Sequence, residues 1–81
     1  MSFYVYILYS DSIKKYYTGQ TSNISLRMEF HNSGKNNFTK KGTPWKIVKT
    51  FECIDRKHAL ILENKIKRNG AKRFLERNFT D

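Results

Sequence analysis

The sequence contains a single cysteine, Cys53, and this scarcity excludes several kinds of protein. One cysteine cannot form a disulfide within the chain, and no Cys/His spacing typical of a zinc site accompanies it. We expect Cys53 to be a small apolar residue in a strand. No long apolar run is present that would span or anchor in a membrane. The first residues also lack the basic, apolar and small-residue order of a signal peptide, so we expect a cytoplasmic protein.

Acidic residues are also few, with seven Asp and Glu against sixteen Lys and Arg. The resulting formal net charge of +9 favours a polyanionic partner, and nucleic acid is the simplest one. A membrane surface is the competing partner, but the absence of an apolar run argues against it. A chain of 81 residues without internal repeats is expected to form one domain over residues 1–81.

Two aromatic stretches near the start predict a pair of strands. Tyr4–Leu8 and Tyr16–Gly19 are rich in β-branched and aromatic residues, and a short polar segment separates them. Apolar residues occupy both faces of Phe3–Tyr9, which is typical of a central strand covered on both sides. The second strand, about Tyr16–Thr21, is more polar and suits a sheet edge. Gly19 in its interior indicates a bulge or a close approach of the backbone.

A first helix is predicted from about Asn23 to Asn32, with Ser33-Gly34 as its end. At about 100° per residue, Arg27 and His31 fall within an apolar arc of this helix. The pattern predicts that both side chains face the body of the protein. A functional pair and a buried structural ion pair both fit that placement.

The remaining sequence predicts a loop, a strand and two helices. Gly34–Pro44 is basic and too polar to pack, which suits either a loop along a phosphate backbone or a plain solvated loop. Trp45–Phe51 is predicted to be a third strand with Trp45 in the core. Asp55 is the expected N-cap of a helix over Arg56–Asn69, and a short basic helix follows.

Glu63 lies in the middle of the inner apolar stripe of this second helix. A carboxylate that faces the core without a partner would be costly, so Glu63 needs a cation, a metal or a hydrogen-bond donor. An ion pair with Arg27 is one solution, and a metal ion is the other.

The inward polar residues are two strand tyrosines, Arg27, His31 and Glu63. No serine or cysteine has partners for nucleophilic catalysis, and no phosphate-cradling P-loop is present. One carboxylate with cations and phenols suits hydrolysis of a phosphodiester with one hard cation such as Mg²⁺. The metal and Arg27 would offset charge that develops on the phosphate. A tyrosine or His31 would accept the proton of the attacking water.

These residues resemble the GIY-YIG domain, in a small stand-alone form related to the N-terminal nuclease module of the excision-repair incision subunit. Val5-Tyr6-Ile7 stands at the first motif of the family and Tyr17-Thr18-Gly19 at the second. Val5 replaces the glycine of the first motif, and Thr18 replaces the central isoleucine of the second. The other matching residues are Thr21, Arg27, His31, Ala59, Glu63, Ile66 and Lys67.

The resemblance implies an α/β (α+β) fold, with a three-stranded antiparallel sheet, the first strand central, and helices around it. It also implies an endonuclease that hydrolyses phosphodiester bonds of nucleic acid, with DNA as the expected substrate and DNA repair or recombination as its setting. One Mg²⁺ or Mn²⁺ ion would be the cofactor. The implied catalytic residues are Tyr6, Tyr17, Arg27 and His31, and the implied metal ligand is Glu63.

Each of these positions carries a role from the family. Tyr6 would act as general base or orient the water, and Tyr17 would lie near the scissile phosphate. Arg27 would stabilise the phosphate, and His31 would assist proton transfer or positioning. Gly19 would let the backbone pass close to the site.

A second hypothesis is a basic nucleic-acid-binding module of the same fold with little or no turnover. Small size supports it, because nucleases of this type usually take specificity from a separate domain or a protein partner. Under either hypothesis, the expected nucleic-acid contacts are Lys35, Lys40, Lys41, Lys67, Arg68 and Lys72. Family nucleases often carry an asparagine beyond the glutamate, but Asn69 has no assigned role.

Overall fold

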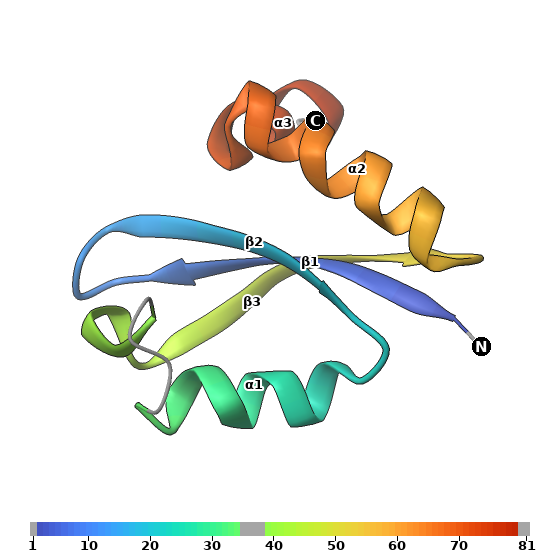
Figure 1. Cartoon of the computed structure of the whole chain (residues 1–81). Coiled ribbons are helices and arrows are strands. Elements are labelled where there is room, and N and C mark those ends of the chain that lie inside the picture. Colours follow the sequence, from blue (N-terminus) through green and yellow to red (C-terminus); the bar gives the residue numbers. More distant parts are fainter. Residues whose placement is uncertain (1, 35–38, 80–81) are drawn as a thin grey trace.

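The computed structural model describes residues 2–34 and 39–79 and contains one sheet with helices on both faces (Figure 1). The strands are β1 (Phe3–Ser10), β2 (Lys15–Thr21) and β3 (Trp45–Cys53). The helices are α1 (Ile24–Asn32), α2 (Arg56–Asn69) and α3 (Ala71–Phe79), and a 3₁₀ turn, η1, spans Lys40–Gly42. Within these described ranges, no helix is long and apolar enough to cross a lipid bilayer.

The sheet is antiparallel in the order β2-β1-β3, which confirms the predicted central position of the first strand. Val5 and Ile7 of β1 are fully buried in the core beneath α2 and α3. Tyr6 and Leu8 alternate with them and belong to a second core cluster on the α1 face. Burial on both faces explains the uninterrupted apolar run in β1. Among the described strands, β2 pairs only with β1, so its other edge is free of a strand partner.

Helix α1 is turned differently from the prediction, and the expected inward orientation of Arg27 is wrong. The helix packs through Ile24, Met28 and His31, which recur at i, i+4 and i+7. Arg27 lies at the margin of this stripe and is exposed. Its guanidinium carbon lies 5.7 Å from the ring centroid of Phe30, which is itself exposed.

Part of the stretch Gly34–Pro44 is packed, which corrects the expectation of a stretch too polar to pack. Thr39 is fully buried and Gly42 is buried. The carbonyl oxygen of Thr39 accepts hydrogen bonds from the Trp45 indole N–H at 2.7 Å and from the Gly42 N–H at 3.1 Å. The polar composition predicted that water would solvate the backbone of this stretch, but the Thr39 carbonyl is hydrogen-bonded within the protein instead.

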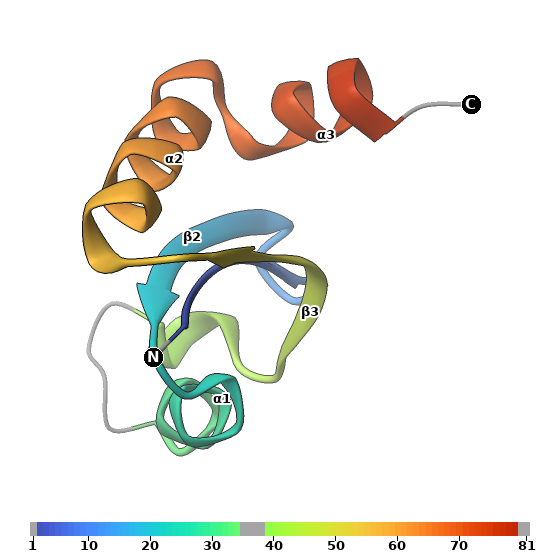
Figure 2. The same cartoon turned by 90° about the vertical axis from the view of Figure 1, so that its right-hand side faces the viewer.

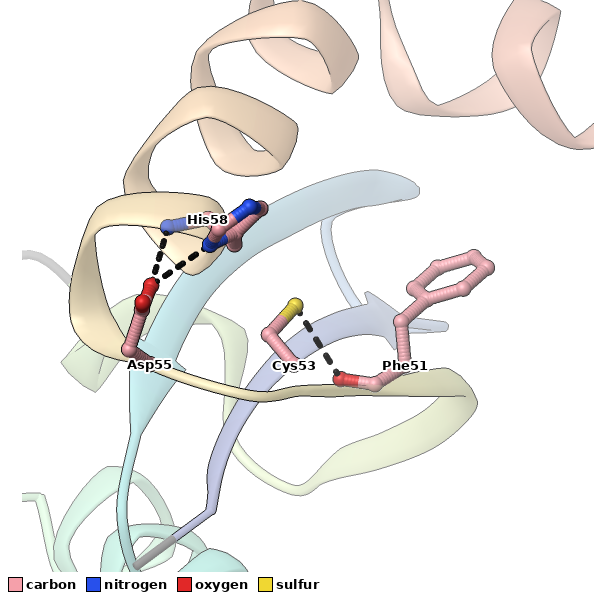
Figure 3. A network of polar contacts seen from close by, with 4 residues as sticks. All are labelled: Phe51, Cys53, Asp55 and His58. Carbon is pink, nitrogen blue, oxygen red and sulfur yellow. Dashed lines mark hydrogen bonds and ion pairs between the residues drawn. The ribbon is translucent and has the colours of Figure 1, made fainter.

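The connection from β3 to α2 fixes where α2 begins (Figure 3). The Oδ1 atom of Asp55 accepts a hydrogen bond from the His58 backbone N–H at 2.8 Å and lies 2.7 Å from His58 Nδ1. These contacts confirm the predicted N-cap and lower the pKa of Asp55. Just before it, Cys53 packs against the core. The cap thereby sets the position of Glu63, two turns further along α2.

Candidate functional site

Three of the predicted residues meet on the α1 face of the sheet. Tyr6 and Tyr17 come from neighbouring strands, and His31 comes from α1. Their ring centroids are 6.5 Å apart for the two tyrosines, 5.7 Å for Tyr6 and His31, and 5.0 Å for Tyr17 and His31. Tyr6 is 3% exposed and His31 is 1% exposed. The cluster is therefore fixed by packing before any ligand binds.

Both ring nitrogens of His31 have hydrogen-bond partners. Nε2 lies 2.9 Å from the Tyr6 hydroxyl, and Nδ1 lies 3.2 Å from the Thr39 hydroxyl. Burial, and then the charge of Arg27, lower the pKa of His31, so the neutral imidazole is favoured. A neutral imidazole has one donor and one acceptor nitrogen, which matches these two contacts. Thr39 is a site residue that the sequence did not reveal, because no motif links it to His31.

The lowered pKa of His31 makes the stability of the protein dependent on pH. Below the ordinary histidine pKa of about 6.5, the unfolded chain takes up a proton that the folded protein resists. The contribution of neutral His31 to the free energy of unfolding is therefore fully present above about pH 6.5 and is lost as the pH falls below that value. We expect the thermal unfolding midpoint to decrease between pH 7 and pH 5, and to decrease less in His31→Gln.

His58 provides the control for this measurement, because it is an exposed histidine at the start of α2. His58→Gln should retain the His31-dependent decrease. Identical pH profiles for the wild type and His31→Gln would contradict the assigned role of the buried imidazole.

Tyr6 lies directly over Gly19 of the free-edge strand. The two residues are register partners across β1 and β2, and a Cβ atom built on Gly19 would lie 2.5 Å from the Tyr6 hydroxyl oxygen. The absence of a side chain at Gly19 therefore makes room for the Tyr6 phenol. The expectation from sequence was that Gly19 would let the backbone pass close to the site. Burial raises the pKa of Tyr6 far above its usual range, with further contributions from Tyr17 and Glu63 against an opposing one from Arg27. Tyr6 is thus a protonated phenol at neutral pH.

Gly19→Ala is expected to displace the Tyr6 hydroxyl and to reduce both stability and activity. The ring has no free space to move into, because it is buried and hydrogen-bonded to His31. Overpacking of this kind costs about 1–3 kcal/mol, which denaturant unfolding would measure. Gly34→Ala is a control for the loss of a glycine, because a Cβ there meets no atom within 4 Å. Its φ of +78° adds local backbone strain, so the comparison concerns activity, which Gly34→Ala should leave unchanged.

Glu63 approaches the same strand from the opposite face of the sheet. It is 9% exposed and accepts a hydrogen bond from Gln20 Nε2 at 2.9 Å. Its other carboxylate oxygen lies 2.7 Å from Lys67 Nζ. Within residues 2–34 and 39–79, Glu63 therefore pairs with Lys67 and not with Arg27. Gln20 was not predicted as a site residue. Because side chains alternate along a strand and Gly19 faces α1, the side chain of Gln20 lies on the α2 face.

The candidate site therefore straddles the free edge of β2. The Tyr6 hydroxyl comes from the α1 face and Glu63 from the α2 face, with the bare backbone of Gly19 and the side chain of Gln20 beside them. Tyr6 and Glu63 thus lie over neighbouring residues of the same strand, on opposite faces of the sheet. At the end of β2, a hollow of about 240 Å³ is lined by Phe3, Gln20, Thr21, Ser22, Arg27 and Arg56. Arg27 thus borders the site from the surface.

The donor set at Glu63 fits one kind of metal ion. In the part of the chain that the structure describes, no three His, Cys, Asp or Glu side chains gather into a ligand cluster. A structural zinc site needs about four protein ligands, whereas Mg²⁺ keeps several waters and binds through one or two carboxylates plus a substrate phosphate. Glu63 therefore fits a hard, mostly hydrated cation, and Lys67 would compete with it for the carboxylate.

The predicted nucleic-acid contacts do not form one surface. Lys40 and Lys41 are exposed at η1 on the α1 side of the sheet, whereas Arg68 and Lys72 are exposed on the α2 and α3 side (Figure 2). Lys67 reaches the candidate site through Glu63. Lys35 lies outside the described residues. Asn69 hydrogen-bonds to the carbonyl of Lys65 at 3.0 Å within α2.

Comparisons with known proteins identify the family and the fold. A family model described as the GIY-YIG catalytic domain matches residues 2–77. The solution NMR structure of the UPF0213 protein BH0048 from Bacillus halodurans is similar, with a TM-score of 0.58 and 27% sequence identity. The match covers 94% of this chain and 81% of that chain. A comparison with curated protein sequences gave no match.

Proposed function

Since this chain belongs to the GIY-YIG family, whose catalytic-domain model spans residues 2–77, we propose that it is a divalent-metal-dependent endonuclease. The family is one of nuclease domains, which implies a nucleic-acid partner. The proposal for this chain rests on one observation, which is that Gly19 and Gln20, neighbours in β2, carry the two halves of the site: the Tyr6–His31 pair lies over Gly19 on one face, and Glu63 hydrogen-bonds to Gln20 on the other. DNA is the proposed substrate, in repair or recombination.

Tyr6 and His31 form a relay for the proton of the attacking water. Because the pKa of Tyr6 is strongly raised, no free phenolate is available to act as the base. The phenolic proton must therefore leave as the water proton arrives. His31 Nε2, 2.9 Å from the hydroxyl and favoured in its neutral form, is placed to receive it. In this step Nδ1–H donates to Thr39, which holds the required tautomer.

Tyr17, Arg27 and Glu63 complete the proposed machinery. Tyr17 packs edge-on against His31 and presents a second phenol beside the relay. Arg27, exposed at the rim, would bind the phosphate and offset its growing charge. Glu63 would hold one Mg²⁺ or Mn²⁺ ion, which supplies Lewis-acid stabilisation of the phosphate when bound. Gln20 orients the carboxylate of Glu63.

Metal removal provides the test of the proposed reaction. We expect the protein to nick supercoiled plasmid, or to cut a labelled branched DNA, with Mg²⁺ or Mn²⁺ and to stop when a chelator is added. Gel electrophoresis of the products measures the rate. Cleavage that persists in excess chelator would contradict the metal dependence.

The alternative is a nucleic-acid-binding module with the same fold and little turnover. The ion pair between Lys67 and Glu63 favours it, because a lysine already neutralises the carboxylate. This alternative predicts salt-dependent binding without products, with a slope that reflects the number of phosphates contacted. Absence of cleavage with either metal, together with such binding, would make it the better account.

A further inference from the structure

A groove crosses the free edge of β2 beside the candidate site, and Tyr17 is the one described lining residue to which the proposed mechanism gives a catalytic role. Its volume is about 490 Å³, which lies within the usual range for ligand pockets. Its walls come from the β1–β2 turn, β2, the first residue of β3 and the junction of α2 with α3. The main lining residues are Ile13, Lys15, Tyr16, Tyr17, Trp45 and Lys67.

The groove offers aromatic side chains that are already held in place. On the α1 face, the rings of Tyr17 and Trp45 pack edge to face with centroids 6.1 Å apart, and Trp45 is 5% exposed. Tyr16 alternates with Tyr17 along β2, so it lies on the other face, where it packs on Tyr9 at 4.8 Å. The Trp45 indole N–H is bonded to the carbonyl of Thr39, so Trp45 presents no unpaired donor to the groove. Tyr16 remains 38% exposed. A flat apolar ring is the chemistry that such a surface accepts.

The charged groups of the groove point to an anionic ligand. Lys15 and Lys67 line it, and none of the described lining residues is acidic. The charge of Lys67 is already partly balanced by Glu63 at the border of the groove, so Lys15 is the main cation that it offers. Lys67 also contacts Glu63 at 2.7 Å, and Tyr17 contacts the ring of His31. The groove is therefore continuous with the residues proposed to act on the phosphate. A ligand with a flat ring and a phosphate is a nucleotide.

We propose that this groove binds the unstacked base of a nucleotide that adjoins the scissile phosphate. The proposal rests on the proposed nuclease function and narrows its substrate class to nucleic acid with unpaired nucleotides. Bases within a duplex cover one another's faces and cannot enter. Bases in single strands or at branches can stack on aromatic side chains while lysines hold the flanking phosphates.

Trp45 is the single tryptophan of the chain, so its emission reports on the groove. The test compares two single-stranded probes of equal charge, hexathymidylate and a hexamer of abasic sugar-phosphates, with a chelator present to prevent cleavage. We expect hexathymidylate to bind about tenfold more tightly and to change the Trp45 emission. Equal affinities for the two probes would overturn the proposal.

Variants of the groove separate base binding from phosphate binding. Tyr16→Ala should reduce the affinity for hexathymidylate to that for the abasic hexamer and leave the abasic hexamer unaffected. Lys15→Ala should weaken both probes by a similar factor. Ile13→Ala tests the same wall without removing the contact of Tyr16 with Tyr9, and should also reduce the preference for bases.

Ile54→Ala is the matched control for Ile13→Ala, because Ile54 is 77% exposed and lies outside the groove. Retention of the full base preference in both Tyr16→Ala and Ile13→Ala would overturn the proposal. The cleavage assay is independent of this test. Cleavage without base preference would reject base binding in the groove and support the nuclease function. Base preference without cleavage would support the groove and contradict the nuclease.

Discussion

Replacing Glu63 with glutamine is expected to lower the cleavage rate by about 10³-fold or more. Glutamine keeps the shape of the side chain but removes the negative charge that would hold the metal ion. Titration calorimetry with Mg²⁺ or Mn²⁺ should show the loss of metal binding independently of cleavage. The nicking rate of supercoiled plasmid gives the effect on activity.

The fold should tolerate this substitution. Lys67 is largely exposed, so its ammonium group is solvated and is not left buried and unpaired when Glu63 loses its charge. The contact with Gln20 can be made by an amide as well as by a carboxylate. Glu76→Gln on α3 is the matched control, because it removes one exposed carboxylate away from the site. Metal-dependent cleavage retained in a clean Glu63→Gln preparation would reject the assignment of Glu63.

The position of β1 and the burial of Glu63 were predictable from sequence because each follows from a one-dimensional pattern. A strand that is apolar on both faces needs packing elements on both faces, and core clusters cover β1 on both sides in the structure. A carboxylate within an apolar helical stripe can only face inward, and Glu63 does. The periodicity of the chain was sufficient for both conclusions.

The orientation of Arg27 and the partners of the site were not predictable in this way. α1 has apolar residues around much of its circumference, including the exposed Leu26 and Phe30, so its pattern did not define one buried face. Gln20 and Thr39 act through hydrogen bonds to residues 43 and 8 positions away. Such contacts depend on how the elements pack, which no local motif records.

Tyr6→Phe is expected to reduce kcat by about 10²–10⁴-fold, the usual contribution of a positioned acid or base. The phenyl ring would still cover Gly19, so the geometry of the strand edge should persist. Loss of the hydroxyl leaves buried His31 Nε2 without its partner, at a cost of about 1–3 kcal/mol in stability. KM should change little, because the hydroxyl acts on the water. Tyr9→Phe on the same strand is the control and should retain activity.

A double-mutant cycle tests whether Tyr6 and His31 act as one relay. If the phenolic proton passes to His31 Nε2 as the water proton arrives, each single substitution disables the same step. Tyr6→Phe combined with His31→Gln should then be about as slow as the slower single variant, because residues that act as a unit are not additive. Single-turnover rates of plasmid nicking at saturating protein measure the cycle. Fully additive losses would show that the two side chains act on separate steps, and would reject the relay while leaving the 2.9 Å contact between them as a structural hydrogen bond.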